Sequence, residues 1–406
     1  MRVGLAAIAL VQLGAVAAVY AVDRIRKVRH RDIQTQNSQD RDPVDVEVDG
    51  QQLRIYTSGK PLYRDMLESI ASAKRQICFE TYVWRADETG RLFKTALQEA
   101  ADRGVKVYAV YDGFGSFKSA PWFKIFPRHS RLFVRRFPEI RTGLLLLNLR
   151  RTGREHRKLL ICDDEVAYVG GYNIGNDFGY EWRDTHVRIR GPQVAELYDG
   201  FVDFWNQFKR RHQPSLERRS TKTWNSAIEM AYNMPSRLLY PVRGLYLDAF
   251  QCAKEHLYIT TAYFVPDREI LAELRAAARR GVRVKVLIPE YSNHILADWV
   301  ARPFYGQLLE VEVEIWLYQN AMIHAKTLAV DSRRSVIGTA NLDPLSMRGN
   351  YEVNLQIDSV EFTQALEQIF ARDLRRARRL TLEEWRRRGK LTRFLELAVQ
   401  AFYPMV

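Results

Sequence analysis

One sequence pattern occurs twice in the chain, 168 residues apart. The first copy reads HRKLLICD at residues 156–163 and the second reads HAKTLAVD at residues 324–331. The likeness continues downstream at the same spacing, where three pairs correspond: Gly170 with Gly338, Asn173 with Asn341, and Asp184 with Glu352. Chance does not explain this in a chain with 8 histidines, because a given His has Lys at the next-but-one position in only about 1 in 20 cases. The repeat therefore predicts two similar halves.

The spacing inside the repeat places His and Lys together. Positions i and i+2 of an extended strand share one face, so His156 shares a face with Lys158, and His324 with Lys326. Two facing halves would surround one small volume with two imidazoles and two ammonium groups. An imidazole, with an ordinary pKa of about 6.5, can attack phosphorus or deliver a proton near neutrality, and lysine neutralises phosphate oxygens. Such a site would suit nucleophilic and acid–base chemistry on an anionic group, and this chemistry requires no cofactor or metal.

The two copies resemble the duplicated HKD motifs of the phospholipase D superfamily, from about Val44 onward. Four further phrases resemble bacterial cardiolipin synthases: ETY at 80–82, DGFGS at 112–116, TAYFVPD at 261–267 and NLDPLS at 341–346. The resemblance implies an α/β fold of two α/β/α halves related by a pseudo-twofold axis. It also implies transfer of a phosphatidyl group from one phosphatidylglycerol to another, through a phosphohistidine intermediate, with release of glycerol.

The resemblance also implies a set of catalytic residues, which are His156, Lys158, Asp163, His324, Lys326 and Asp331. We expect His156 to be the nucleophile and His324 the acid, although pseudo-symmetry leaves the reverse assignment open. Asp163 and Asp331 are expected to hold the motif strands and their neighbours rather than to touch substrate.

Four further polar residues are candidates for the site. Asn173 and Asn341 are expected to donate amide hydrogens to the substrate phosphate. Asp184 and Glu352 each follow their motif His by 28 residues. The resemblance implies that a carboxylate at this place accepts a hydrogen bond from a histidine and fixes its tautomer, and the alternative is a surface carboxylate.

Three functions remain open from the sequence. The first is a membrane-anchored cardiolipin synthase, with phosphatidylethanolamine as another conceivable phosphatidyl donor. The second is a hydrolytic phospholipase D or a nuclease that uses the same residues on water. The third is a basic, non-catalytic binding protein, against which the two intact motifs argue. The best-known bacterial synthases carry two amino-terminal membrane segments or none, whereas this chain shows one candidate.

The net charge of +14, from 62 Lys and Arg against 48 Asp and Glu, suits a partner that carries phosphate, either nucleic acid or an anionic membrane. The resemblance favours an anionic phospholipid substrate over nucleic acid. Cys78, Cys162 and Cys252 have neither zinc-ligand spacing nor a disulfide pattern, so we expect reduced core residues.

The segment Val3–Val22 is apolar except for Gln12, and its 20 residues are the length that a helix needs to cross a bilayer. Five basic residues follow it, at positions 24, 26, 27, 29 and 31. Positive flanks stay in the cytoplasm, so we predict a single-pass anchor in the bacterial inner membrane with the catalytic part on the cytoplasmic side. The alternative is a cleaved signal peptide ending near Ala21.

The remaining organisation follows from composition and periodicity. Helical spacing predicts helices over Thr89–Arg103 and Arg268–Arg280, ended by Gly104 and Gly281. Their alternation with apolar strands predicts a largely parallel sheet in each half. The predicted divisions are an anchor with its flank at 1–31, a tether at 32–43, a first half at 44–208, a connection at 209–240, a second half at 241–370 and a basic amphipathic segment at 371–406. That last segment, with Trp385, is predicted to lie at a bilayer interface or to pack on the sheet.

Overall fold

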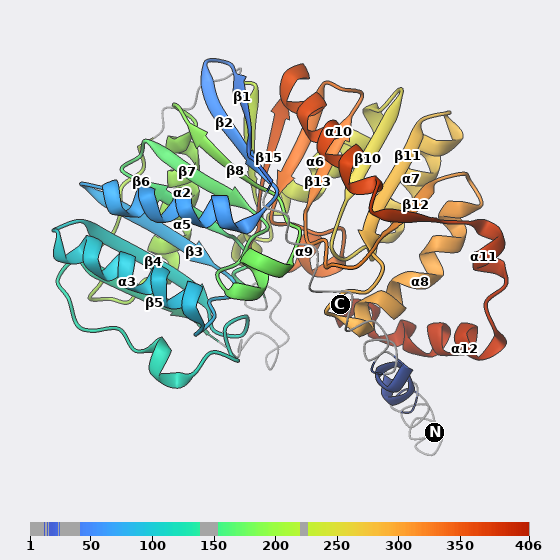
Figure 1. Ribbon diagram of the computed structural model, residues 1–406, viewed down its shortest axis with the longest axis horizontal. Helices are drawn as coiled ribbons and strands as arrows, with labels where there is room; N and C mark the ends of the chain where they lie inside the picture. Colours follow the sequence, from blue (N-terminus) through green and yellow to red (C-terminus); the bar gives the residue numbers. More distant parts are fainter. Residues whose placement is uncertain are drawn as a thin grey trace.

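The computed structural model describes residues 41–138, 153–219 and 226–405, and of the first 40 residues only 12, 14, 16–22 and 24. The described chain forms two eight-stranded sheets that stand beside each other, each flanked by helices (Figure 1). An α/β fold of two halves was predicted, and the two sheets agree with it.

The first sheet has the strand order β1-β2-β8-β7-β6-β3-β4-β5. Its strands are β1 (Val44–Val48), β2 (Gln51–Tyr56), β3 (Gln76–Thr81), β4 (Lys106–Asp112), β5 (Leu132–Phe137), β6 (Leu159–Cys162), β7 (Val166–Gly170) and β8 (His186–Arg190). Strands β3, β4 and β5 run parallel, and every other neighbouring pair in this sheet is antiparallel.

The second sheet has the order β16-β12-β11-β10-β13-β14-β15-β9. Its strands are β9 (Ile228–Tyr232), β10 (His256–Thr260), β11 (Arg283–Pro289), β12 (Glu314–Tyr318), β13 (Thr327–Val330), β14 (Arg334–Gly338), β15 (Val353–Asp358) and β16 (Ala377–Leu380). Six strands, β15-β14-β13-β10-β11-β12, repeat the order β8-β7-β6-β3-β4-β5 of the first sheet. The internal repeat of the sequence is therefore a repeat of structure.

The prediction of largely parallel sheets was wrong. In each half the motif strand returns through a short hairpin, from β6 to β7 and from β13 to β14, so it pairs antiparallel with its successor. These hairpins turn through left-handed residues that are not glycine, with φ of 54° at Asp163, 62° at Asp164, 50° at Asp331 and 54° at Ser332. Asp and Asn tolerate this conformation better than most residues, but without glycine the turns gave little signal in the sequence.

The helices are α2 (Gly59–Ser72), α3 (Glu88–Asp102), α5 (Val194–Phe208), α6 (Pro241–Cys252), α7 (Arg268–Arg279), α8 (Ile295–Leu309), α9 (Pro344–Arg348), α10 (Val360–Leu374), α11 (Leu382–Arg386) and α12 (Lys390–Ala398). Short helical turns are η2 (Pro121–Lys124), η4 (Asp177–Glu181), η5 (Pro235–Arg237) and η6 (Val399–Met405). Helices α3 and α7 confirm the two predicted helices. Each begins at an aspartate that accepts main-chain N–H groups, Asp87 and Asp267, and each is followed by a glycine with positive φ.

One of the hydrophobic clusters is shared by the two halves. Helices α2 and α3 pack on one face of the first sheet, and α6, α7 and α8 pack on one face of the second. Between the sheets, α5 and α10 bury their apolar faces in a cluster that takes residues from both halves, including Phe201 and Trp205 from α5 and Leu355 from β15. Such a shared core fixes one half against the other.

The predicted membrane anchor, Val3–Val22, lies mostly outside the described residues. No helix in the described parts of the chain is both long and apolar enough to cross a bilayer. The described end of the segment packs on the second half, where Val19 is fully buried and Val16 and Val22 contact the same cluster.

The regions outside the two predicted halves differ from the divisions expected. Strand β9, within the predicted connection, joins the second sheet. The arginine-rich carboxyl segment is not one helix, because β16 pairs with β12 at the sheet edge. Trp385 is buried, with the guanidinium of Arg388 3.2 Å from its ring centre, so it packs on the second half. Cys78 and Cys162 are buried as expected, whereas Cys252 is exposed.

Candidate active site

Each motif His and Lys lies directly before its strand, β6 or β13, in buried extended chain. The Lys158 ammonium folds back on its own motif and donates to the His156 carbonyl at 2.6 Å. Lys326 donates to the His324 carbonyl in the same way. The side chains of all four residues, His156, Lys158, His324 and Lys326, are buried. In both halves, therefore, the motif Lys is held against the main chain of its own motif His.

The chain joins the two motifs to the opposite halves by main-chain pairing. Glu155 forms an isolated bridge with Tyr351, and Ile323 forms one with Arg183. The N–H of His156 donates to the carbonyl of Tyr351 at 3.1 Å, and the N–H of His324 donates to the carbonyl of Arg183 at 2.7 Å. Each motif His is thus tied to the residue just before the other half's acidic residue.

The acidic residues consequently reach across the interface. His156 Nδ1 lies 2.9 Å and 3.0 Å from the two carboxylate oxygens of Glu352. His324 Nδ1 lies 2.6 Å from Asp184 Oδ2. A carboxylate only accepts, so each Nδ1 carries the proton, and each Nε2 keeps its lone pair for chemistry. Both carboxylates are buried, which contradicts the surface alternative for Asp184 and Glu352.

The two acids are braced differently. Thr339 donates its hydroxyl to Glu352 Oε2 at 2.5 Å. At the corresponding place in the first half stands Gly171, where a Cβ would come within 2.1 Å of Asp184 Oδ1. Asp184 Oδ1 instead accepts the main-chain N–H of Thr185 at 2.7 Å. The shorter acid thus needs a glycine beside it, and the longer acid has room for a hydroxyl.

Charges from both halves act on each imidazole. Burial lowers the pKa of His156, and the ammonium groups of both Lys158 and Lys326 lower it further. Burial also lowers the pKa of His324, to about 3, with the same two lysines contributing. The two motifs therefore share one electrostatic site. A bound phosphodiester, which is an anion, would favour a protonated imidazole in this site.

Both predicted asparagines are buried. Asn173 Oδ1 accepts the N–H of Val83 at 3.0 Å. Asn341 is buried as well, and its Oδ1 has no hydrogen-bond partner within the described chain. A buried polar group without a partner is costly, and this oxygen is an acceptor, so the group that would satisfy it is a donor such as a hydroxyl rather than a phosphate oxygen.

Asp163 and Asp331 lie at the far ends of β6 and β13 from the histidines. Asp163 accepts main-chain N–H groups of residues 74, 75 and 76 at 2.7 to 2.9 Å. Asp331 accepts those of residues 254, 255 and 256 at 2.8 Å. Each carboxylate therefore binds the main chain where the adjacent strand, β3 or β10, begins. Both of its oxygens accept hydrogen bonds there. These contacts are the ones expected of residues that hold the motif strands and their neighbours, and a direct part for Asp163 and Asp331 in catalysis stays a prediction.

Several residues of the site were not given a role from the sequence. The Tyr82 ring packs edge-on against the His156 ring at 4.8 Å between centres. Trp182 and Tyr263 lie 5.1 Å and 6.1 Å from the His324 ring. Tyr82 and Tyr263 stand in two of the phrases that suggested the family, which was the available signal. Aromatic walls of this kind exclude water from the imidazoles.

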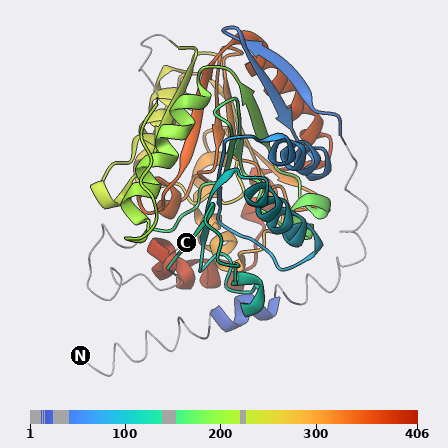
Figure 2. The same ribbon diagram turned by 90° about the vertical axis from the view of Figure 1, so that its left-hand side faces the viewer.

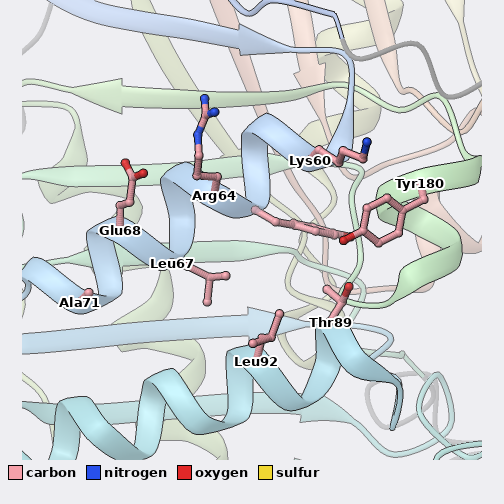
Figure 3. Close-up of a pocket in the computed structure, with 9 residues that line it drawn as sticks. Lys60, Arg64, Leu67, Glu68, Ala71, Thr89, Leu92 and Tyr180 are labelled. Carbon is pink, nitrogen blue, oxygen red and sulfur yellow. The ribbon is translucent and has the colours of Figure 1, made fainter.

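A separate groove of about 470 Å³ lies between α2 and α3. Figure 3 shows Leu67 and Leu92 facing each other across it, with Tyr180 at one end. Its wall includes Tyr63, whose hydroxyl donates to the Asn173 carbonyl at 2.5 Å. Tyr63 therefore connects the wall of the groove to the segment that carries Asn173. The side chains of the two motif histidines and the two motif lysines do not line the groove.

Comparison with known proteins agrees with this geometry. The family model described as "Cardiolipin synthase, PLD-like domain" matches residues 66–205 and 246–374. The chain belongs to this family. Cardiolipin synthase 2 of Staphylococcus epidermidis is 33% identical over 369 residues, which are 87% of this chain and 74% of that protein. Cardiolipin synthase of Listeria monocytogenes is 31% identical over 367 residues, 87% of this chain and 75% of that protein.

A solved structure shows the same fold. Phosphatidylserine synthase of Haemophilus influenzae aligns with a TM-score of 0.66 and 16% identity, and the alignment covers 94% of this chain and 98% of that one. The predicted superfamily and the predicted class, a phosphatidyltransferase of the cardiolipin synthase type, are confirmed by the family match and the two synthases.

The cross-half carboxylates provide a direct test of the geometry. Glu352→Gln and Asp184→Asn are each expected to lower kcat by about 10- to 100-fold, because an amide can turn its NH₂ toward Nδ1 and select the wrong tautomer. Combining Glu352→Gln with His156→Ala should cost no more than His156→Ala alone, because the two residues act as a unit. Steady-state kinetics of the single and double variants measure this. Independent effects in that pair would contradict the cross-half pairing.

A pH dependence follows from the two lysines. Burial lowers the pKa of Lys158 to about 7 and that of Lys326 to about 8, so the free site loses positive charge as the pH rises through this range. We expect kcat/KM to fall above about pH 7, while kcat changes less because bound phosphate raises both pKa values. Lys158→Arg keeps its charge and should leave only the fall near pH 8. A value of kcat/KM that stays constant to about pH 9 would contradict this assignment.

Proposed function

We propose that this chain transfers a phosphatidyl group from one phosphatidylglycerol to another, forming cardiolipin and glycerol. The observation that carries the proposal is the pair of imidazoles, each held by a carboxylate of the opposite half. In the proposed site each ring uses its Nε2 on the same phosphorus, beside the two lysines, as two-step displacement requires. The synthases of Staphylococcus and Listeria support the choice of substrates.

In the first step, His156 Nε2 attacks the phosphorus of one phosphatidylglycerol. A P–N bond forms and the P–O bond to the glycerol headgroup breaks. His324, protonated in the presence of the anionic substrate, gives its Nε2 proton to the departing oxygen. Lys158 and Lys326 neutralise the non-bridging oxygens, and Asn173 and Asn341 donate their amide hydrogens to them. Glycerol leaves and a phosphatidyl-histidine remains.

In the second step, the headgroup hydroxyl of another phosphatidylglycerol attacks the same phosphorus. His324, now neutral, takes the hydroxyl proton, and the P–N bond breaks so that His156 is restored. Asp184 and Glu352 hold the two rings in one tautomer throughout and stabilise any imidazolium that forms. The near-symmetry of the site leaves open the exchange of roles between the two histidines.

A lipid assay tests the proposal against hydrolysis. The purified full chain is incubated with phosphatidylglycerol in detergent plus a chelator, and the lipids are resolved. Cardiolipin and glycerol are expected, because the imidazoles supply both nucleophile and acid. Phosphatidate as the main product would instead indicate a phospholipase D. Turnover that requires added phosphatidylethanolamine would change the donor, and an absence of turnover would refute the proposal.

We also propose that Val3–Val22 anchors the protein in the bacterial inner membrane, with the two halves on the cytoplasmic side. The length of the apolar segment supports an anchor, and the basic residues after it support this orientation. The last turns of the segment, which include Val19, would then lie against the second half. Protease treatment of spheroplasts tests it, because a cytoplasmic catalytic part is protected until the membrane is opened. Digestion of the catalytic part in intact spheroplasts would show that it lies on the outer side of the membrane and would contradict the proposed orientation.

A further inference from the structure

Two sets of large apolar side chains face solvent on the described surface. The first, which we call the loop plate, consists of Phe114, Phe117, Trp122 and Ile125 in the loop between β4 and β5, with exposed fractions of 48% to 70%. The second, which we call the helix plate, consists of Leu391, Phe394 and Leu397 on α12, with exposed fractions of 54% to 72%. Gathered apolar surface of this kind is unfavourable in water and marks a surface that is covered in use.

The loop plate is carried by a well-anchored loop. Phe123 is buried, with its ring centre 5.8 Å from that of Trp84. Lys94 donates to the carbonyls of Phe123 and Ile125 at 2.6 Å and 2.7 Å. Trp122 and Ile125 are therefore held outward by the same short stretch that Phe123 fixes inward.

The helix plate lies on the outer side of a helix whose inner side is fully used. Leu395 and Val399 are buried in the core of the second half. Glu396, also buried, pairs with Arg302 at 2.7 Å and with Arg388 at 3.1 Å. The exposed residues recur every third position, which places them along one side of the helix. Helix α12 therefore keeps a second apolar side that the described chain does not cover.

Each plate is connected to the catalytic site of its half through intervening residues. The Ser116 hydroxyl, in the loop of the first plate, accepts the N–H of Trp84 at 3.0 Å and donates to the Tyr82 carbonyl at 3.2 Å, and Tyr82 packs on His156. In the second half, Tyr403 of η6, directly after α12, donates to the Pro266 carbonyl at 3.4 Å, three residues beyond Tyr263.

The plates also lie at one end of the molecule. Helix α12 and η2, which carries Trp122, both lie toward the lower end in Figure 1, and they remain there in Figure 2 after the quarter turn about the vertical. The described turns of the amino-terminal helix, residues 16–22, lie at the same end. The segments that carry the two plates therefore share one end of the molecule with the described part of the amino-terminal helix.

The charges around the plates select the partner. Residues 113–131 contain no Asp or Glu, and residues 386–406 contain only the buried Glu396. Exposed Lys118 and Arg128 flank the loop plate, and exposed Lys390 and Arg393 flank the helix plate. Aromatic and aliphatic side chains among basic ones are typical of surfaces that enter the interface of an anionic bilayer. The bases of single-stranded nucleic acid stack on aromatic rings, and the aliphatic residues Ile125, Leu391 and Leu397 offer no such stacking surface.

We propose that the loop plate and the helix plate together dock the catalytic halves on an anionic phospholipid bilayer. The inference rests on the proposed function for the identity of the lipid, and it adds where the protein meets the leaflet. Docking of this kind would hold the catalytic halves at the leaflet that contains the substrate, so that lipid need not cross bulk water to reach the protein.

Site-specific labels on the full chain test the proposal directly. In a Cys252→Ser background, which leaves only the buried Cys78 and Cys162, Phe117→Cys and Phe394→Cys are each labelled with an environment-sensitive fluorophore. Glu47→Cys on β1, exposed at the opposite end, serves as the control. Vesicles that contain phosphatidylglycerol should shift the emission of both plate labels to the blue and make them quenchable by brominated acyl chains. The label at position 47 should not change.

The experiment measures where each label lies relative to the bilayer. Vesicle binding by itself would not test the plates, because the amino-terminal segment could attach every variant to vesicles. Plate labels that behave like the label at position 47 would overturn the proposal. Labels shielded without vesicles, together with a dimer in sedimentation velocity, would also overturn it and identify a second copy of the chain as the occupant.

Two charged variants keep docking and catalysis distinguishable. Phe117→Glu/Trp122→Glu and Leu391→Glu/Leu397→Glu are each expected to lower turnover on vesicles by about 10-fold or more, with turnover of a soluble short-chain substrate within about 2-fold of wild type. His156→Ala should show the opposite result, with normal label shifts and no turnover. Unchanged vesicle turnover in both charged variants would overturn the docking face while leaving the proposed reaction intact.

Discussion

Replacing either His156 or His324 by alanine is expected to lower cardiolipin formation by about 10⁴-fold or more, since each step of the proposed reaction uses both rings. Loss of either one removes the nucleophile or the proton donor, and the remaining imidazole cannot do both tasks on the same phosphorus. The double variant should be little worse than either single variant, because the two rings act as a unit. Product formation from labelled phosphatidylglycerol measures the effect.

The histidine experiment needs a control for folding and a control for surface histidines. Circular dichroism and thermal unfolding of each alanine variant should remain close to wild type. His212→Ala, at an exposed position after α5, should retain full turnover. Either alanine variant that keeps more than about 1% of wild-type activity would contradict a site shared by both halves.

The same variants distinguish the roles of the two rings. The variant that retains the nucleophile can still form the P–N bond slowly, so its intact mass should increase by one phosphatidyl group. We expect this mass in His324→Ala and not in His156→Ala. The reverse result would exchange the two roles and leave the chemistry otherwise as described.

The candidate catalytic histidines and lysines could be predicted from the sequence because their identity and their spacing are local features of the chain. His and Lys two residues apart share a face in any extended chain, and the repeat required that this occur twice. Helices α3 and α7 were equally accessible, because an aspartate begins each and a glycine ends each within the same short stretch.

What the sequence could not show was which acid serves which histidine. Asp184 lies closer in sequence to His156, and Glu352 to His324, yet the hydrogen bonds run crosswise. The crossing depends on the bridges between Glu155 and Tyr351 and between Arg183 and Ile323. Those bridges exist only once the two sheets pack together, and no periodicity within one strand encodes them.

A second feature hidden from the sequence is a buried charge cluster behind the first motif. Arg157 lies between the histidine and lysine of that motif. Its guanidinium is buried and pairs with Glu80 at 2.7 Å and with Glu155 at 3.2 Å. It also donates to the Gly200 carbonyl at 3.1 Å and lies 4.4 Å from the ring centre of Phe204. The second half lacks this cluster, with Thr260, Ile323 and Ala325 at the three corresponding positions.

Arg157→Ala is therefore expected to lower the free energy of unfolding by about 3–5 kcal/mol, because it leaves two buried carboxylates without a counter-charge. Burial already raises the pKa of Glu155 to about 7 and raises that of Glu80. Without Arg157 both pKa values rise further, so the folded state holds more protons than the unfolded state above about pH 4.5. Stability of the variant should consequently decrease as the pH rises from about 5 to 8, more steeply than for wild type. Urea unfolding followed by circular dichroism at the two pH values measures this difference.

The second half supplies the matched variant. Replacing the cluster by its counterparts, Glu80→Thr with Glu155→Ile and Arg157→Ala, removes both carboxylates together with the cation. This triple variant should recover at least about half of the free energy of unfolding lost in Arg157→Ala. The reason is that uncharged side chains, which the second half already accommodates at these positions, replace buried charges whose desolvation is costly. Its stability should also lose the added pH dependence. A triple variant as unstable as Arg157→Ala at both pH values would show that packing around the guanidinium, rather than the unpaired carboxylates, sets the cost. The asymmetry between the halves would then have to be explained by shape and not by charge.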